Sequence, residues 1–64
     1  MRITVYHFQF YTGSEEEGTL QMFREENVAM RIGHDINRLA RSLMEKHNAD
    51  EIDCHVVLSC DLAD

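Results

Sequence analysis

The apolar positions near the start of the chain are dense: residues 3–11 are rich in β-branched and aromatic side chains and contain neither Gly nor Pro. This composition predicts a β-strand. Side chains of a strand alternate between its two faces, and here both faces are apolar, with Ile3 and Val5 on one and Tyr6, Phe8 and Phe10 on the other. Such a strand is typical of the centre of a sheet, and a bulge near His7 would produce the same shift in alternation.

The next two segments differ in pattern. Residues 12–18 are polar with a Gly near each end, which predicts a solvated loop. Residues 19–24 place Leu20 and Met22 on one face, and we expect them to form a short second strand.

The apolar residues of the middle segment fill one continuous arc of about 160° on a helical wheel: Val28, Ala29, Ile32, Ile36, Leu39, Ala40, Leu43 and Met44. Extending the wheel backwards puts Leu20 and Phe23 on the polar side, so we expect the helix to begin after them. Asn27 is the predicted N-cap. The helix is predicted to stop at residues 47–48, after Lys46 in its last turn.

Residues 52–59 alternate between apolar and mostly polar positions, which predicts a last strand. The order strand, strand, helix, strand predicts one α+β domain over residues 1–64. Its antiparallel sheet has three strands in the order 2-1-3, with the amphipathic helix on one face. The alternative is a βαβ unit in which residues 19–24 start the helix or stay irregular.

A single helix covers one face of a three-stranded sheet. We therefore expect the other face to stay open and to form an interface. The prediction is self-association as a symmetric homodimer through the aromatic residues of the first strand, Tyr6, Phe8 and Phe10.

The charge of the chain is acidic and unevenly distributed. Twelve Asp and Glu against six Lys and Arg give −6, divided into −2 over residues 1–23, +1 over residues 24–47 and −5 over residues 48–64. Repulsion from phosphate argues against general nucleic-acid binding. Neither a membrane-spanning stretch nor a signal peptide is evident. Two cysteines are too few for a disulfide scaffold, so we expect a cytoplasmic protein that makes no membrane contact.

The residues that could carry chemistry do not form a recognisable motif. Six side chains could bind a metal: His7, His34, His47, Cys54, His55 and Cys60. None has the close pairing of a zinc site, because the adjacent Cys54 and His55 point to opposite faces of a strand. Glycine-rich phosphate loops and strained serine turns are also missing. We expect no metal, no cofactor and no enzymatic activity.

The predicted helix carries a basic stripe on its outer face. Its members recur at helical spacings and are Arg31, His34, Arg38 and Arg41. Arginine suits the recognition of carboxylates and phosphates, and aromatic strand residues stack on bases in RNA-binding sheets. Direct nucleic-acid binding through the arginine stripe or the aromatic strand is therefore the alternative function.

The acidic residues suggest a different function. Two groups carry them, one in the loop and one at the start of the last strand: Glu15, Glu16, Glu17, Asp50, Glu51 and Asp53. Together they would imitate phosphate charge and occupy a basic channel on another protein. Small acidic proteins of phages and mobile elements, including inhibitors of bacterial defence nucleases, act in this way, and the likeness is one of size and charge. We therefore predict a small acidic protein-binding module, an inhibitor or regulator of a nucleic-acid-handling partner.

Overall fold

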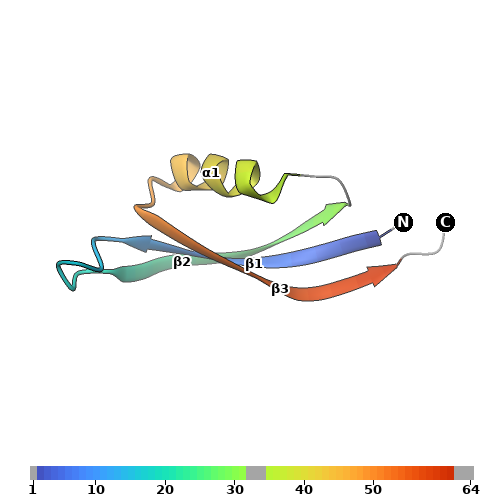
Figure 1. Cartoon of the computed structure of the whole chain (residues 1–64), viewed down its shortest axis with the longest axis horizontal. Helices are drawn as coiled ribbons and strands as arrows, with labels where there is room; N and C mark the ends of the chain where they lie inside the picture. Colours follow the sequence, from blue (N-terminus) through green and yellow to red (C-terminus); the bar gives the residue numbers. More distant parts are fainter. Residues whose placement is uncertain (1, 32–34, 62–64) are drawn as a thin grey trace.

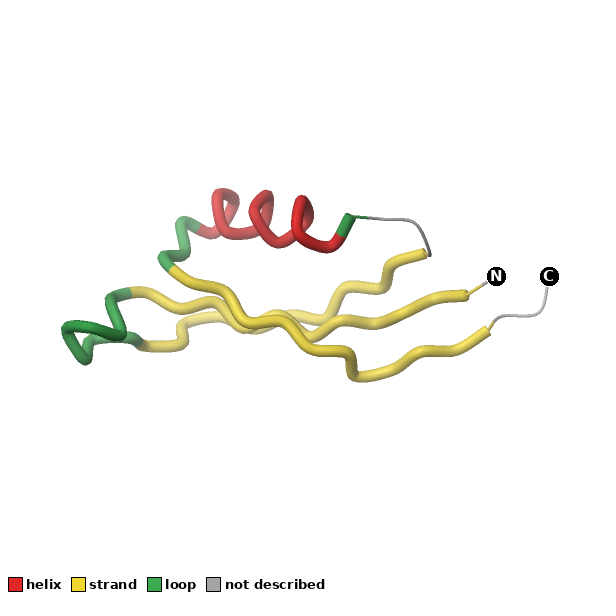
Figure 2. Tube along the Cα trace, in the orientation of Figure 1, coloured by secondary structure: helices red, strands yellow, loops and turns green. Residues whose placement is uncertain are grey.

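The computed structural model describes residues 2–31 and 35–61, and it has the predicted β-β-α-β order. The elements are β1 (Arg2–Thr12), β2 (Gln21–Arg31), α1 (Ile36–His47) and β3 (Glu51–Asp61). The strands form one sheet in the order β2-β1-β3, with both pairs antiparallel. Figures 1 and 2 show α1 lying along one face of this sheet. The predicted sheet order is therefore confirmed.

The predicted start of the helix is wrong. The helix begins at Ile36, and Val28, Ala29 and Arg31 belong to β2, which extends well past the predicted end at residue 24. The reason is backbone pairing: β2 runs beside β1 from Thr12 almost to its beginning and satisfies the hydrogen bonds of that edge. The even positions from Glu26 to Met30 are half-buried and the odd ones are exposed, which is the period of a strand. Ala29, which the helical wheel placed beside Val28 on the apolar arc, is therefore on the exposed side.

Both ends of α1 are capped by side-chain or backbone groups. Oδ1 of Asp35 accepts hydrogen bonds from the backbone N–H groups of Asn37 and Arg38, at 3.0 and 3.2 Å. Asp35 is therefore the N-cap, in place of the predicted Asn27. The helix ends at the predicted place, where Asn48 adopts the left-handed conformation with φ 53° and Ala49 N–H donates to the carbonyl of Met44.

The turn between β1 and β2 depends on a glycine. Gly13 has φ +100°, and a Cβ there would collide with the backbone carbonyl of Thr19. Its N–H donates to Oδ2 of Asp50 at 2.8 Å, and the Thr12 hydroxyl donates to the same oxygen at 3.3 Å. The turn is thereby tied to the residue that precedes β3.

The core lies between β1 and α1. Phe8 and Phe10 are 0% exposed and pack with Leu43 of α1. Half-buried apolar residues surround them: Tyr6, Val28, Ile36, Leu39, Ala40, Ala49 and Ile52. The aromatic face of β1 is therefore the covered face, and the prediction that Tyr6, Phe8 and Phe10 form an open, self-associating face is wrong. The helix covers the face with the larger rings, which bury the most apolar area.

The strand irregularities lie in the two outer strands. In β2 the register shifts between the partners of Phe10 and Tyr11, so that Phe23 is the extra, unpaired residue. In β3 it shifts between the partners of Val5 and Tyr6, so that Val57 is the extra residue. β1 is thus the central strand, as its two apolar faces predicted, and the alternative of a bulge near His7 is not observed; each neighbouring strand carries one bulge instead. β1 itself alternates without interruption.

Replacing Asp35 with Ala should lower the free energy of unfolding by about 1 kcal/mol, because two backbone N–H groups lose their acceptor. Urea unfolding followed by circular dichroism measures the change. Ser42→Ala, at an exposed position within α1, is the control and should leave stability nearly unchanged. Equal stability of D35A and the unaltered protein would contradict this helix start.

Replacing Phe8 with Ala should cost about 3–5 kcal/mol, because it opens a cavity at the centre of the core. That is comparable to the whole stability of a domain this small, so the cooperative urea transition should be lost. Phe23→Ala, at a residue 46% exposed, is the matched control and should keep the transition. Similar behaviour of the two variants would show that the core is misplaced.

Candidate interaction surfaces

Two predicted acidic groups lie at the same end of the sheet. Glu15, Glu16 and Glu17 occupy the exposed turn after β1, and Glu51 and Asp53 are exposed at the start of β3. The Asp50 carboxylate accepts from the turn, and Asp50 N–H donates to the carbonyl of Tyr11. In Figure 1 the turn and the first residues of β3 lie at the same end. Asp50 thus anchors the turn, and its carboxylate is engaged within the chain.

The strand β2 adds a carboxylate to this acidic end, on the open face of the sheet, which is the face opposite α1. Gln9 of β1 pairs with Glu25 of β2 and with Asp53 of β3, and the next open-face residue of β1, Tyr11, pairs with Glu51. The open face therefore carries three carboxylates from its two outer strands at this end. Glu25 was not among the predicted acidic residues, because it fell between the predicted second strand and the predicted helix.

Tyr11 lies between these carboxylates. Its hydroxyl donates to Oε1 of Gln9 at 3.3 Å. Partial burial raises the pKa of the phenol, and the nearby charges of Asp53 and Glu25 raise that pKa further. The phenol therefore stays protonated, and its single O–H donor is engaged by Gln9 within the face.

His7 links β1 to β2 at the centre of the open face. Its Nδ1 lies 2.6 Å from Oδ1 of Asn27, and its Nε2 lies 2.9 Å from Oε2 of Glu25. Both partners are acceptors, so both contacts are hydrogen bonds only when both ring nitrogens carry protons. The hydrogen bond to Asn27, and then the one to Glu25, raise the pKa of His7. The ring of His55 lies 5.2 Å away on β3.

Glu26 lies on the covered face and is held within the chain. Its Oε2 accepts from the Arg24 guanidinium at 3.0 Å, and Oε1 is 3.6 Å from Nε2 of His47. The hydrogen bond from Arg24 lowers the pKa of Glu26 although burial opposes it. This carboxylate therefore belongs to the packing of β2 against α1.

The predicted arginine stripe is divided between two elements. Arg38 and Arg41 are exposed on α1, whereas Arg31 is the last residue of β2. His34 lies outside the described residues. The helical spacing that placed Arg31 on this stripe fails, because the helix starts five residues later, at Ile36.

The side chains that could bind a metal were compared with the geometry of the described residues. Within residues 2–31 and 35–61, no group of three or more His, Cys, Asp or Glu side chains could hold a metal ion. Cys54 and Cys60 are both free thiols, and burial raises the pKa of Cys54, which disfavours its thiolate. In the same part of the chain, no helix has the length and apolar character needed to cross a membrane.

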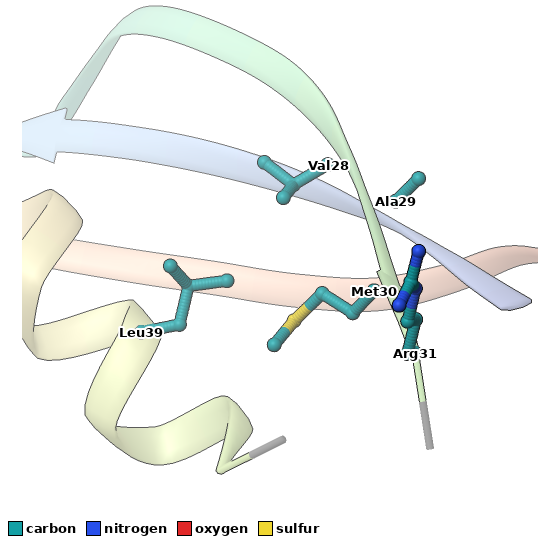
Figure 3. Close-up of a pocket in the computed structure, with 5 residues that line it drawn as sticks. All are labelled: Val28, Ala29, Met30, Arg31 and Leu39. Atoms are coloured by element: carbon teal, nitrogen blue, oxygen red, sulfur yellow. The ribbon is translucent and has the colours of Figure 1, made fainter. Parts of the chain in front are cut away.

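An apolar groove lies between α1 and the end of β2. It has a volume of about 420 Å³ and is lined by Val28, Ala29, Met30, Arg31 and Leu39. Figure 3 shows the Met30 side chain extending from β2 toward α1, near Leu39. A second hollow of about 240 Å³ involves Thr12, Phe23, His47 and Asn48. Neither brings together the polar groups that orient a small ligand.

Comparison of the chain with protein-family models, with curated proteins and with solved structures finds no match.

The imidazolium of His7 should titrate above its ordinary pKa of 6.5. Because the pKa is higher in the folded state, the stabilisation is fully present below about pH 6.5 and is lost as the pH rises through the folded value. An NMR titration of the ring protons measures the pKa, and Asn27→Ala should lower it. A midpoint that N27A leaves unchanged would contradict the assigned contact.

Proposed function

We propose that this chain is a small acidic protein-binding module that occupies a basic surface of a nucleic-acid-handling partner. The observation that carries the proposal is the gathering of carboxylates at one end of the sheet. This acidic end consists of the exposed residues Glu15, Glu16, Glu17, Glu25, Glu51 and Asp53. The predicted Asp50 supports it from within.

The charge distribution supports a basic partner. The chain carries −6, and five of the six residues of the acidic end come from the turn and the start of β3. Concentrated charge of one sign attracts and orients a partner of opposite sign during association. A basic channel that binds the phosphates of a nucleic acid offers that complement, and carboxylates would take the place of phosphates there.

The ordered backbone beneath the acidic end favours a binding role for its carboxylates. The turn is held by Asp50, and the strands beneath Glu25 and Asp53 are backed on the other face by Phe8 and Phe10. Carboxylates held on a packed sheet lose less conformational entropy on binding than carboxylates on a free tail. This part of the surface is therefore suited to recognition.

The activity under this proposal is to occupy a partner and not to catalyse a reaction. The setting that we propose is cytoplasmic, where free thiols such as Cys54 and Cys60 stay reduced. An origin in a phage or other mobile element follows from the analogy of size and charge. The proposal includes self-association of the chain as a homodimer.

Direct nucleic-acid binding has less support. The rings of Phe8 and Phe10 are fully buried and offer no surface for stacking on bases. Of the predicted stripe, Arg38 and Arg41 stay together as two exposed cations on α1. Two cations give little affinity for a polyanion when the chain has a net charge of −6.

Affinity capture followed by mass spectrometry tests the proposal. The unaltered chain should capture one or a few basic nucleic-acid-handling proteins from a lysate of its host, and added DNA should displace them. A variant with Glu15, Glu16 and Glu17 changed to Gln, Glu51 to Gln and Asp53 to Asn should lose the capture. The affinity for the partner should fall about tenfold or more, because each exposed ion pair contributes up to about 1 kcal/mol.

The matched control is Glu45→Gln, which removes one exposed carboxylate from α1 away from the acidic end and should leave capture unchanged. Capture that survives neutralisation of the acidic end would contradict the proposal. Gel shifts of the chain with DNA and RNA, weakened by salt and by Arg38→Ala with Arg41→Ala, would instead establish the nucleic-acid alternative.

A further inference from the structure

The outer edge of β3 is an unpaired strand edge with apolar side chains. β3 pairs with β1 along one side and is the last strand of the described sheet on the other. At its centre Val56, Val57 and Leu58 are 56%, 51% and 55% exposed. An unpaired row of backbone N–H and C=O groups beside apolar side chains is a template for another strand.

The two outer edges of the sheet differ in protection. The outer strand β2 carries charged residues at its centre and at its last position: Arg24, Glu25, Glu26 and Arg31. Charged side chains on an edge discourage pairing with another strand. In β3 the carboxylates are confined to the ends, at Glu51, Asp53 and Asp61, and residues 54–60 contain no Asp, Glu, Lys or Arg. Only the edge of β3 therefore has a neutral centre.

We propose that the outer edge of β3 pairs with the same edge of a second copy of this chain, antiparallel, about a two-fold axis between Val56 and Val57. The product is a six-stranded sheet in the order β2-β1-β3-β3-β1-β2 with both helices on one face. This inference specifies the surface for the self-association proposed above, and it is independent of the basic partner at the acidic end.

The bulge at Val57 determines which registers are possible. Before the bulge the even residues lie on the covered face, as Cys54 does opposite Phe8. After the bulge the odd residues do, as Ser59 does opposite Thr4. Strands paired about this axis must place cross-strand neighbours on the same face. A residue before the bulge must therefore pair with one after it such that their two residue numbers add to an odd sum.

The register centred between Val56 and Val57 meets this requirement and the charge pattern together. Its pairs are Val56 with Val57, His55 with Leu58, Cys54 with Ser59, Asp53 with Cys60, and Ile52 with Asp61. No pair joins two carboxylates. Among the odd sums, this one sets the exposed Val56 against Val57, whereas sums of 111 and 115 set Val56 against His55 and Ser59. The strand is thus complementary to itself, with apolar side chains opposed at its centre and no carboxylates opposed along it, and this complementarity is why we infer a second copy as the occupant.

Sedimentation equilibrium tests the inference. The chain should reach twice its mass of 7.5 kDa as its concentration rises through the micromolar range. Val56→Lys should raise the dissociation constant about tenfold or more, since it removes apolar burial and brings two cations together. Ala29→Lys, at an exposed residue of β2, is the matched control and should not change it. A chain that stays monomeric, or a V56K dimer of unaltered affinity, would overturn the inference.

Disulfide trapping tests the register without depending on V56K. Ser59→Cys in a Cys60→Ser background should cross-link to the native Cys54 of the second copy under mild oxidation, giving a covalent dimer on a non-reducing gel. The control carries Cys54→Ser as well, and the single thiol that it keeps, at position 59, should give no dimer. Absence of the cross-link in a chain that sediments as a dimer would overturn the edge pairing. Capture of a basic partner by the acidic end would be unaffected by either result.

Discussion

The contact of Phe8 and Phe10 in β1 with Leu43 in α1 is the interaction on which the rest of the fold depends. These three are the buried apolar residues of the described chain. The helix has 12 residues and spans about 18 Å, whereas each 11-residue strand spans about 36 Å. The helix therefore covers about half of one sheet face, and the aromatic pair determines which half.

The surfaces follow from that unequal cover. The half of the sheet that packs against α1 contains the start of β3 and adjoins the turn between β1 and β2. The carboxylates at this end therefore project from the part of the sheet that the core supports. The other half lacks the core, and Val56, Val57 and Leu58 of β3 stay more than half exposed. A single short helix thus produces both an ordered acidic end and an apolar strand edge, which suit two different kinds of contact.

The sequence was sufficient to predict β1, β3 and the end of the helix, because each has a local signal, and the order of the elements was sufficient to predict the order of the sheet. The extent of β2 was predicted too short, at residues 19–24 in place of Gln21–Arg31. The start of the helix was not predictable from periodicity alone. Val28 and Ala29 fit the apolar arc of a helix, and pairing of β2 with β1 overrode that pattern. The alternation of β1 also indicates two apolar faces without indicating which one the helix covers. Both assignments fit the sequence equally well, and only the packing of Phe8 and Phe10 against Leu43 identifies the aromatic face as the covered one.

The candidate site was predictable in part for the same reason. Runs of acidic residues in the turn and in β3 are visible in the sequence, and the antiparallel order brings them to one end. Glu25 and the His7 contacts depend on the register between β1 and β2, and they could not be predicted while residue 25 was placed outside a strand. Arg31 was assigned to the helix by the same error.

Residue-resolved amide hydrogen exchange on dilute protein tests most directly whether this core organises the fold. The slowest exchange should occur in β1 around Phe8 and Phe10, where strands flank both sides and α1 covers the face. Exchange should be faster in β1 near Ile3 and in β3 near Val57. Uniform protection along β1, or the strongest protection near Ile3, would contradict a fold organised by one core at the acidic end.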